Sequence, residues 1–305
     1  MALVSVIIPT YNRAEVVVRA VNSALTQTFQ DVEVIVIDDG SSDQTLEVLG
    51  PYLGRIKYIR NNERQGVSAA RNRGIRESSA PLVAFLDSDD YWLPEKLEAQ
   101  VEFFRENREA VACQTNEIWI REGKRVNPKK KHQKPSGDIF LPSLRLCLVS
   151  PSAVMLRREV LAEVGGFDET FPVCEDYDLW LRISLKYPIY LISAPLVVKV
   201  GGKLDQLSRA FWGMDRFRIR SLIKLLLMED LTRAQQEAVF FELKRKCTIY
   251  ATGCYKRGKK AEADLYASLP MALAEALTEK RRDDALKLSC KINMLQRLQL
   301  NFPPQ

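Results

Sequence analysis

The sequence predicts an α/β fold in which a mostly parallel sheet is flanked by helices and followed by an all-α C-terminal region. Three observations support this prediction. In the first 90 residues, short apolar runs alternate with segments whose apolar residues recur at helical spacing. Each run ends in a polar loop, as strands do at the ligand-binding edge of a parallel sheet. Beyond about residue 204, the chain is rich in Leu, Ala, Lys, Arg and Glu with helical periodicity.

The alternation predicts four strands, at Leu3–Ile8, Val32–Ile37, Arg55–Ile59 and Leu82–Leu86. Three helices are expected between them, at Ala14–Gln27, Ser42–Leu53 and Val67–Glu77. Three such crossovers imply parallel pairing with helices on both faces of the sheet. Further helices are expected to begin near Pro94 and near Glu175.

The C-terminal helices are expected at Ser208–Met228, Leu231–Lys256, Lys259–Glu275 and Lys280–Leu298, with breaks such as Arg257-Gly258 and Leu269-Pro270. We therefore predict one domain over residues 1–203 and a helical region over 204–305. An apolar stripe with basic flanks, Ile219 to Leu227, either faces the core or lies on a membrane surface.

Composition limits the class of protein. With 305 residues and 46% hydrophobic content, the chain can bury a full-sized core. No run of eighteen apolar residues occurs, and no basic segment or cleavage site precedes the first strand, so we expect a cytoplasmic protein. Six cysteines lack Cys-x-x-Cys spacing and there is one histidine, His132, which argues against structural zinc and for reduced thiols.

The net charge of +6 is unevenly distributed. The segment 121–134 contains seven Lys and Arg residues against one Glu, and its prolines predict an exposed loop. This loop is either simply solvated or attracts a phosphate-bearing acceptor or anionic lipid head groups. Aromatic residues do not interleave with the charges, which disfavours nucleic acid as a partner.

The stretch Phe85-Leu-Asp-Ser-Asp-Asp-Tyr-Trp92 follows the fourth strand. If strand geometry continues past Leu86, Asp87 and Asp89 point to one side and Asp90 to the other. Two carboxylates that face one volume can share a hard cation such as Mg²⁺ or Mn²⁺ and leave positions for phosphate oxygens. The alternative is an Asp-rich turn that caps the helix near Pro94.

The other polar loops suit a nucleoside diphosphate. Neither Gly-x-Gly-x-x-Gly nor a P-loop sequence is present, which disfavours dinucleotide and ATP sites. Tyr11 offers a ring for stacking, Asp39 an acceptor for a ring N–H and Arg71 a guanidinium for phosphate. Each also has an ordinary structural interpretation, as a helix-entry aromatic, a turn former and a solvated helix residue.

Four segments together resemble the successive motifs of family 2 glycosyltransferases, which have the GT-A fold. They are Val4-Ser-Val-Ile-Ile-Pro-Thr-Tyr-Asn-Arg13, Val36-Ile-Asp-Asp-Gly-Ser-Ser-Asp43, Gly66-Val-Ser-Ala-Ala-Arg-Asn-Arg-Gly74 and the acidic stretch. A later block, Gly165-Gly-Phe167 with Cys174-Glu-Asp-Tyr-Asp-Leu-Trp-Leu-Arg182, resembles the acceptor-side signature. The resemblance covers about the first two-thirds of the chain and implies an inverting, nucleotide-sugar-dependent enzyme.

The resemblance also implies site residues. Those expected at the nucleotide are Pro9, Thr10, Tyr11, Asp39, Arg71, Asp87 and Ser88, with Asp39 at the uracil or an equivalent ring. Asp89 is expected to bind the metal, Mn²⁺ or Mg²⁺, that bridges the diphosphate.

The acceptor hydroxyl attacks from the face opposite the departing diphosphate and must lose its proton as it does so. The candidate base for this proton is Asp176. A helix that begins near Glu175 would help keep Asp176 ionised. Asp178 and Arg182 can pair at i, i+4, which favours a structural role for Asp178. Glu175 is either a first-turn acid or an acceptor contact.

One departure from the family concerns a histidine that many relatives carry after the strand that here reads Pro195–Val200. The chain continues Gly201-Gly-Lys-Leu-Asp-Gln-Leu-Ser208 and has no histidine there. Lys203 either neutralises the diphosphate directly or is only a loop charge. His132 is interpreted as a solvated residue rather than a replacement ligand.

These inferences predict transfer of a sugar from a nucleotide-diphosphate donor, with a UDP-sugar expected, to a hydroxyl of a glycan or lipid-linked glycan in polysaccharide biosynthesis. Such a protein would be cytoplasmic or peripheral at the inner face of the membrane. The alternatives are a sugar-nucleotide pyrophosphorylase and a catalytically silent relative that binds nucleotide-sugars.

Overall fold

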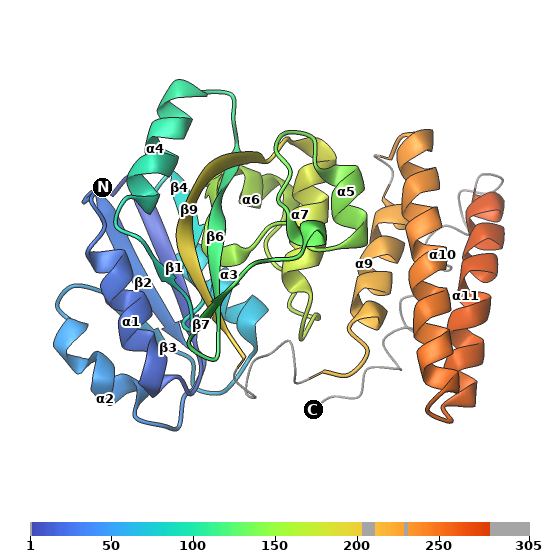
Figure 1. The fold of residues 1–305 in the computed structure, drawn as a ribbon, viewed down its shortest axis with the longest axis horizontal. Coiled ribbons are helices and arrows are strands. Elements are labelled where there is room, and N and C mark those ends of the chain that lie inside the picture. The colour runs from blue at the N-terminus through green and yellow to red at the C-terminus, as the bar shows by residue number, and fades with distance from the viewer. Residues whose placement is uncertain (1, 203–210, 229–230, 281–305) are drawn as a thin grey trace. The chain divides into compact units, whose positions relative to one another are not determined.

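The computed structural model describes residues 2–202, 211–228 and 231–280 (Figure 1). Two compact units are present, Met1–Ala210 and Phe211–Gln305. Residues 203–210 lie outside the described residues, so the boundary expected at 203/204 stays a prediction. Lys203 and Cys290 also lie outside the described residues. The same holds for the helix expected at Lys280–Leu298, except for Lys280 itself.

The first half of the sheet is parallel, as predicted. Its strands lie in the order β3-β2-β1-β4, with bounds β1 Val4–Thr10, β2 Val32–Asp38, β3 Lys57–Arg60 and β4 Leu82–Phe85. All residues of β1 are buried, as expected for a central strand covered on both faces. The carboxyl ends of these strands therefore meet at one edge.

The intervening helices are α1 (Ala14–Leu25), α2 (Thr45–Leu49) and α3 (Val67–Glu77). Helix α3 lies close against β1, since a Cβ on Gly74 would be 2.3 Å from Cγ2 of Ile7. Helix α2 is shorter than predicted and continues as the 3₁₀ helix η1 (Gly50–Tyr52), because its expected first residues form a hydrogen-bonded loop.

The second half of the sheet is mixed. β8 (Val154–Arg157) pairs antiparallel with β4 and with β6 (Ala112–Arg121), which pairs parallel with β9 (Tyr190–Gly201). β5 (Tyr91–Trp92) closes the edge, and β7 (Lys124–Val126) forms a hairpin with β6. The predicted α/β fold with C-terminal helices is confirmed, while parallel pairing dominates only the first half of the sheet.

The remaining elements of the first unit surround this mixed half. They are α4 (Lys96–Glu106), η2 (Lys130–His132), α5 (Phe140–Arg145), η3 (Pro151–Ala153), α6 (Arg158–Val164) and α7 (Glu175–Lys186). Two apolar clusters fill the two faces of the sheet, one around Val6 and Trp92 and one around Phe85 and Trp180. The second cluster brings α7 against the sheet.

The second unit is helical, with α9 (Asp215–Leu227), α10 (Arg233–Tyr255) and α11 (Lys260–Lys280). Ile219, Leu222, Ile223 and Leu226 of the α9 stripe are buried, which favours its core-facing interpretation. The break expected at Leu269-Pro270 is wrong: α11 continues through Pro270, and both residues are buried. Among the described helices, none is both long enough and apolar enough to cross a membrane.

Candidate active site

The loops that follow β1 and β2 are joined by Asn12. Its side-chain oxygen accepts hydrogen bonds from the backbone N–H of Ser42 at 2.8 Å and of Asp43, and its own N–H donates to Oγ of Ser41 at 2.9 Å. Asn12 adopts a left-handed conformation with φ of 50°, which asparagine tolerates better than most residues. Sequence reasoning passed over Asn12, although it lies inside a quoted motif.

The predicted nucleotide residues of this first loop lie together at the end of β1. Pro9 and Thr10 are buried, and Oγ1 of Thr10 has no hydrogen-bond partner among the described residues. A buried hydroxyl without a hydrogen-bond partner costs free energy. A ligand or a water molecule that bonds to this atom would remove that cost. Tyr11 is half-buried, and the guanidinium of Arg64 lies 4.5 Å from its ring centroid. The guanidinium of Arg64 thus covers the predicted stacking ring.

Asp39 is buried and organises the loop after β3. Its carboxylate accepts hydrogen bonds from Nδ2 of Asn61 at 2.7 Å and from the backbone N–H groups of Gln65 at 2.9 Å and Gly66 at 2.7 Å. An ionised carboxylate has about four acceptor positions, so about one remains for a ring N–H. The structure shows the loop-ordering role, and the ring contact stays a prediction.

The acidic stretch forms a turn rather than a continuing strand. β4 ends at Phe85, and the N–H of Asp90 donates to the carbonyl of Asp87 at 3.0 Å. The expectation that strand geometry persists through Asp89 is therefore wrong, because a tight turn follows the buried strand. Asp87 and Asp89 are half-buried, and Ser88 is buried.

Asp90 points away from solvent. It accepts hydrogen bonds from Oγ of Ser152 at 2.7 Å and from the backbone N–H of Val200 at 3.0 Å, and burial raises its pKa to about 8. Asp90 thereby joins the acidic turn to β9 and to η3. The turn is held in place by this carboxyl, which leaves Asp87 and Asp89 as the accessible pair.

Arg71 of α3 links the acidic turn to the start of α7. Its Nη2 donates to Oδ1 of Asp87 at 2.7 Å and its Nη1 to Oε1 of Glu175 at 2.5 Å, and its guanidinium lies 5.0 Å from the ring centroid of Phe167. Arg71 is only 3% exposed. The prediction of a nucleotide contact for Arg71 stays open, while the two carboxylate contacts bring distant parts of the chain together.

The first turn of α7 contains the candidate base. Burial raises the pKa of Glu175 to about 7 against the opposing effect of Arg71, and the charge of Asp176 adds to the rise. Asp176 is half-buried; its Oδ1 accepts from the N–H of Tyr177 at 2.7 Å, and Sγ of Cys147 lies 3.5 Å from its Oδ2. Asp176 therefore lies next to a residue that Arg71 ties to Asp87.

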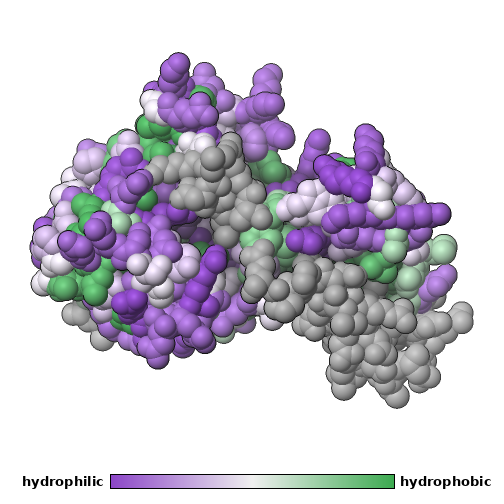
Figure 2. Space-filling model, turned by 90° about the horizontal axis from the view of Figure 1, so that it is seen from below, coloured by the Kyte–Doolittle hydropathy of each residue, from purple (hydrophilic) through white to green (hydrophobic). Residues whose placement is uncertain are grey.

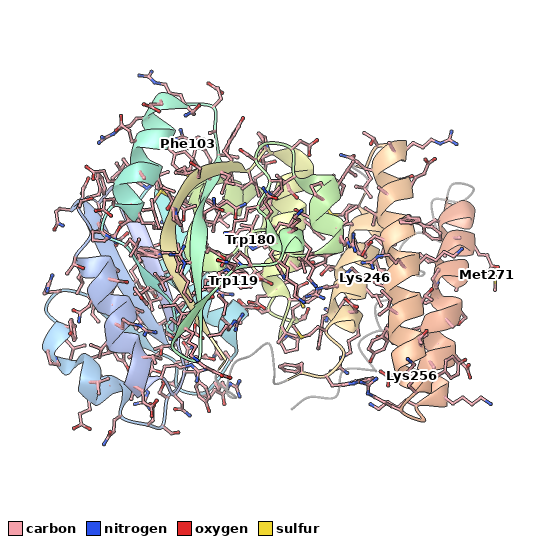
Figure 3. The ribbon with its side chains drawn as sticks, in the orientation of Figure 1. Phe103, Trp119, Trp180, Lys246, Lys256 and Met271 are labelled. Atoms are coloured by element: carbon pink, nitrogen blue, oxygen red, sulfur yellow. The ribbon has the colours of Figure 1, made fainter. Side chains whose placement is uncertain are left out.

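Asp178 has the structural role that the spacing favoured. Its carboxylate pairs with Nε of Arg182 at 3.0 Å, and Arg182 also donates to the carbonyls of Val164 at 2.6 Å and Gly166 at 2.8 Å. This pair fixes the Gly165-Gly166-Phe167 turn beneath Arg71. Trp180, labelled on α7 in Figure 3, packs edge-on against Phe167 with ring centroids 6.1 Å apart.

Lys199 of β9 is a site residue that sequence reasoning missed. Its Nζ donates to Oγ of Ser150 at 3.0 Å. Burial lowers its pKa, but the charges of Glu117, Asp90, Asp87 and Asp176 outweigh burial and raise the pKa above its ordinary value. Lys199 therefore stays protonated beside both acidic groups. The available signal was a lysine inside the apolar run Pro195–Val200.

The segment 121–134 is not uniformly exposed. The side chain of Lys134 is buried, and its Nζ pairs with Oε1 of Glu117 at 2.8 Å; the two side chains are 8% and 5% exposed. The expectation of a loop that is exposed throughout is therefore wrong at Lys134, because Glu117 offsets the cost of burying its charge. His132 is half-buried against Trp119, with ring centroids 5.2 Å apart, rather than simply solvated.

Comparison with known proteins agrees with this architecture. Residues 5–165 match the model of glycosyl transferase family 2. The chain belongs to this family. An uncharacterized glycosyltransferase of Rickettsia prowazekii is 31% identical over 193 residues, which are 62% of this chain and 60% of that protein. The UDP-Glc:α-D-GlcNAc-diphosphoundecaprenol β-1,3-glucosyltransferase WfaP of Escherichia coli is 33% identical over 61% of this chain and 72% of its own length.

A solved structure has the same fold. The structure of S. aureus TarS 1-349 in complex with UDP-GlcNAc matches with a TM-score of 0.71 at 22% identity, over 88% of this chain and 79% of that chain. This family 2 chain therefore has the GT-A fold that its motifs indicated.

A divalent cation fits the donors of this family 2 site in part. In the described residues, no group of three or more His, Cys, Asp or Glu side chains is placed to hold a metal. Mg²⁺ in phosphate-binding sites is usually held by one or two carboxylates together with the substrate's own phosphates. The half-buried Asp87 and Asp89 supply that type and number of ligand.

Proposed function

We propose that this family 2 protein transfers a sugar, with inversion, from a UDP-linked donor to a hydroxyl of a glycan carried on a lipid diphosphate. Two E. coli relatives, WfaP and WfgD, are named as transferring glucose from UDP-Glc onto diphosphoundecaprenol-linked GlcNAc, which supports this donor and acceptor. The observation that carries the proposal is the Arg71 bridge. It ties Asp87 of the acidic turn to the first turn of α7, so that acidic groups lie on two sides of one site.

On the donor side, the proposed nucleotide contacts are the residues at the ends of β1, β2 and β4, with Arg71 behind them. Oγ1 of Thr10 supplies a buried hydroxyl without a protein partner, and Asp39 retains an acceptor position for the base. Asp87 and Ser88 would lie at the ribose. Hydrogen bonds already fix Asp39, Arg71 and Asp87, and Thr10 lies in β1, which reduces the ordering cost of binding.

Asp89 is the proposed protein ligand of Mn²⁺ or Mg²⁺. When bound with the donor, such a cation would stabilise the negative charge that grows on the departing diphosphate. Asp87 neutralises part of Arg71, and Lys199 contributes a fixed positive charge next to both acidic groups. These side chains set the charge of the site before any substrate arrives.

On the acceptor side, Asp176 is the proposed general base. Asp176 lies in the first turn of α7, where the helix dipole attracts negative charge, and its charge interacts favourably with that of Lys199. Asp176 would accept the proton of the acceptor hydroxyl as that oxygen attacks the anomeric carbon opposite the diphosphate. A single displacement of this kind inverts the configuration of that carbon.

The proposed acceptor also suggests where the protein works. A glycan on a lipid diphosphate presents its sugar at a membrane surface. A protein that uses UDP-sugars from the cytoplasm would meet such an acceptor at the inner face of the membrane, as a peripheral protein.

The test is a transfer assay with a panel of UDP-sugars and GlcNAc carried on a lipid diphosphate, with Mn²⁺ or with a chelator. We expect transfer from one UDP-sugar, loss of most activity with the chelator, and a product whose anomeric configuration, read by NMR, is opposite to that of the donor. UDP binding without transfer to any glycan would instead support a catalytically silent relative. Absence of UDP binding would overturn the donor assignment.

A further inference from the structure

We propose that a basic hairpin beside the site binds the diphosphate of the acceptor, with Trp119 beneath the acceptor's first sugar. The basic hairpin is defined here as six residues at the end of β6, on β7, and at the start of η2: Arg121, Lys124, Arg125, Lys129, Lys130 and Lys131. This inference rests on the proposed function, since it names how the lipid-linked acceptor is recognised.

The charges of the basic hairpin are exposed and uncompensated. All six side chains lie on the surface, and none forms an ion pair with a carboxylate in the described part of the chain. Burial, and after it the charges of Lys131 and Lys129, lower the pKa of His132. Cations that repel one another in this way are stabilised when an anion binds among them, and a diphosphate is the anion on the proposed acceptor.

The register of the sheet places this hairpin next to the acidic groups. Trp119 of β6 is the partner of Lys199 on β9, and Arg121 is the partner of Gly201. Val200, between these two β9 residues, donates its N–H to Asp90. Adjacent strands are about 4.8 Å apart and residues about 3.3 Å apart along a strand, so the base of the hairpin begins within roughly 10 Å of the acidic turn.

The side chains of this part of β6 lie on the same face as the site. Glu117 and Trp119 are two residues apart, and the indole N–H of Trp119 donates to Oε2 of Glu117 at 2.9 Å. The negative charges of Glu117, Asp87 and Asp176 all raise the pKa of Lys199. Trp119 therefore lies next to Lys199 in the sheet, on the side of Lys199 that continues toward the hairpin.

The hairpin is held at a defined position. Lys134, just after η2, pairs with Glu117 in the protein interior at 2.8 Å, and the guanidinium of Arg121 lies 5.6 Å from the ring centroid of Trp119. Gly201 leaves the space for this arginine, because a Cβ there would be 1.6 Å from Nη1 of Arg121. The basic residues thus extend from a fixed base, and Trp119 is half-buried with His132 on one side.

The hairpin lies in the acceptor half of the sheet. The residues proposed at the base of the nucleotide follow β1 and β2, whereas β6 is separated from β1 by β4 and β8 in the strand order. Three strand spacings correspond to about 14 Å, which is more than the length of a diphosphate. The face of this unit that is visible in Figure 2 is mostly hydrophilic.

The test is the double variant Lys124→Gln/Arg125→Gln, assayed with two soluble acceptors: GlcNAc on a short-chain prenyl diphosphate, and GlcNAc on an uncharged alkyl chain. We expect the KM for the diphosphate acceptor to rise about tenfold, as charged hydrogen bonds are lost, with the kcat and the KM for the donor changed less than about twofold. The KM for the uncharged acceptor should not change.

The control is Arg105→Gln/Arg108→Gln, which removes two exposed cations at the end of α4 and in the loop before β6. The ten-residue strand β6, about 30 Å long, separates this loop from the hairpin. This variant should leave every constant unchanged. Thermal unfolding of both variants checks that exposed substitutions have left the fold intact.

Three outcomes would overturn the inference: equal changes with both acceptors, a rise in the KM for the donor, or an unchanged KM together with lost binding to phosphatidylglycerol vesicles. The last outcome would assign the hairpin to the membrane surface. Absence of transfer by the wild-type protein would count against the proposed function instead. Calorimetric titration of the diphosphate acceptor into the wild-type protein and the hairpin variant would then decide the inference, since only the wild-type protein should bind it tightly.

Discussion

Arg71 joins three separate parts of the chain at the site. Its two terminal nitrogens contact Asp87 and Glu175, which are 88 residues apart in the chain, and its ring contact with Phe167 adds a third element. A guanidinium can hold two carboxylates in fixed directions because its donors form a rigid fork, whereas an ammonium acts as a point charge. The bridge therefore depends on arginine and not only on positive charge.

We expect Arg71→Lys to keep the fold but loosen the bridge. The free energy of unfolding should fall by about 1 to 3 kcal/mol, since one buried carboxylate loses its partner. The kcat should fall by roughly 100-fold, because small displacements of positioned groups are costly in catalysis. Urea unfolding and steady-state kinetics measure the two effects.

The matched control is Arg76→Lys on the same helix. The side chain of Arg76 is 66% exposed, and its ion pair with Glu169 is long at 4.0 Å. It should change the free energy of unfolding by less than about 0.5 kcal/mol. If Arg71→Lys behaves like this control, the bridge does not position the site.

At the residue scale, sequence reasoning found groups that are distinctive in their type and spacing. The i, i+4 pair of Asp178 and Arg182 is local, so the spacing alone predicted it correctly. Lys199 was missed because its partners lie on four other segments, and no local pattern reports such contacts. Asp90 was expected to point away from the pair on the basis of strand geometry, which the turn does not have; the structure instead shows it as a buried anchor to Ser152 and Val200.

At the scale of elements, the hairpin of β6 and β7 depends on the buried pair of Glu117 and Lys134. Although burial raises the pKa of Glu117, Lys134 and Lys199 outweigh it and hold the pKa at about 2, below the ordinary value of 4.5. Glu117 is therefore ionised in the folded protein over the whole neutral and mildly acidic range. Its ionisation adds stability that is present above pH 4.5 and lost as the pH falls toward 2.

Glu117→Gln should accordingly destabilise the protein by about 3 kcal/mol at pH 7, and this difference should shrink as the pH falls from 4.5 toward 2. Urea unfolding of both proteins at pH 7, 5 and 3 measures the difference. A difference that is independent of pH would show that the loss comes from packing rather than from the ion pair.

The βαβ units of the first half were predicted correctly from periodicity, because each strand and each helix is formed by one continuous run of residues. The second half contains short strands whose partners are far away: β8 joins β4 to β6, and β5 has two residues. Lys134 looked like part of a charged loop, since the sequence does not show that Glu117 faces it. Pro270 was expected to break α11, yet the helix continues through it.

At the scale of the whole molecule, the first unit closes its own core. Its two large apolar clusters draw on residues between Leu3 and Val197 and use none from the second unit. The proposed catalytic residues all lie in this unit as well. We therefore propose that donor binding belongs to the first unit alone.

A chain that ends at Ala210 should fold cooperatively and bind UDP with a Kd within about threefold of the full chain, a difference below about 0.7 kcal/mol. Thermal unfolding and calorimetric titration with UDP and Mn²⁺ measure these properties. A truncated chain that unfolds without a transition, or that binds UDP far more weakly, would show that the helical unit completes the site.

Substitution of Asp176 tests the proposed mechanism most directly, because it distinguishes a loss of catalysis from a loss of donor binding. Asp176→Asn and the wild-type protein should be compared for transfer from the UDP-sugar and, in parallel, for UDP affinity. We expect the kcat to fall by about 100-fold or more while the Kd for UDP stays within about twofold. Transfer at an undiminished rate by Asp176→Asn would contradict the proposed mechanism.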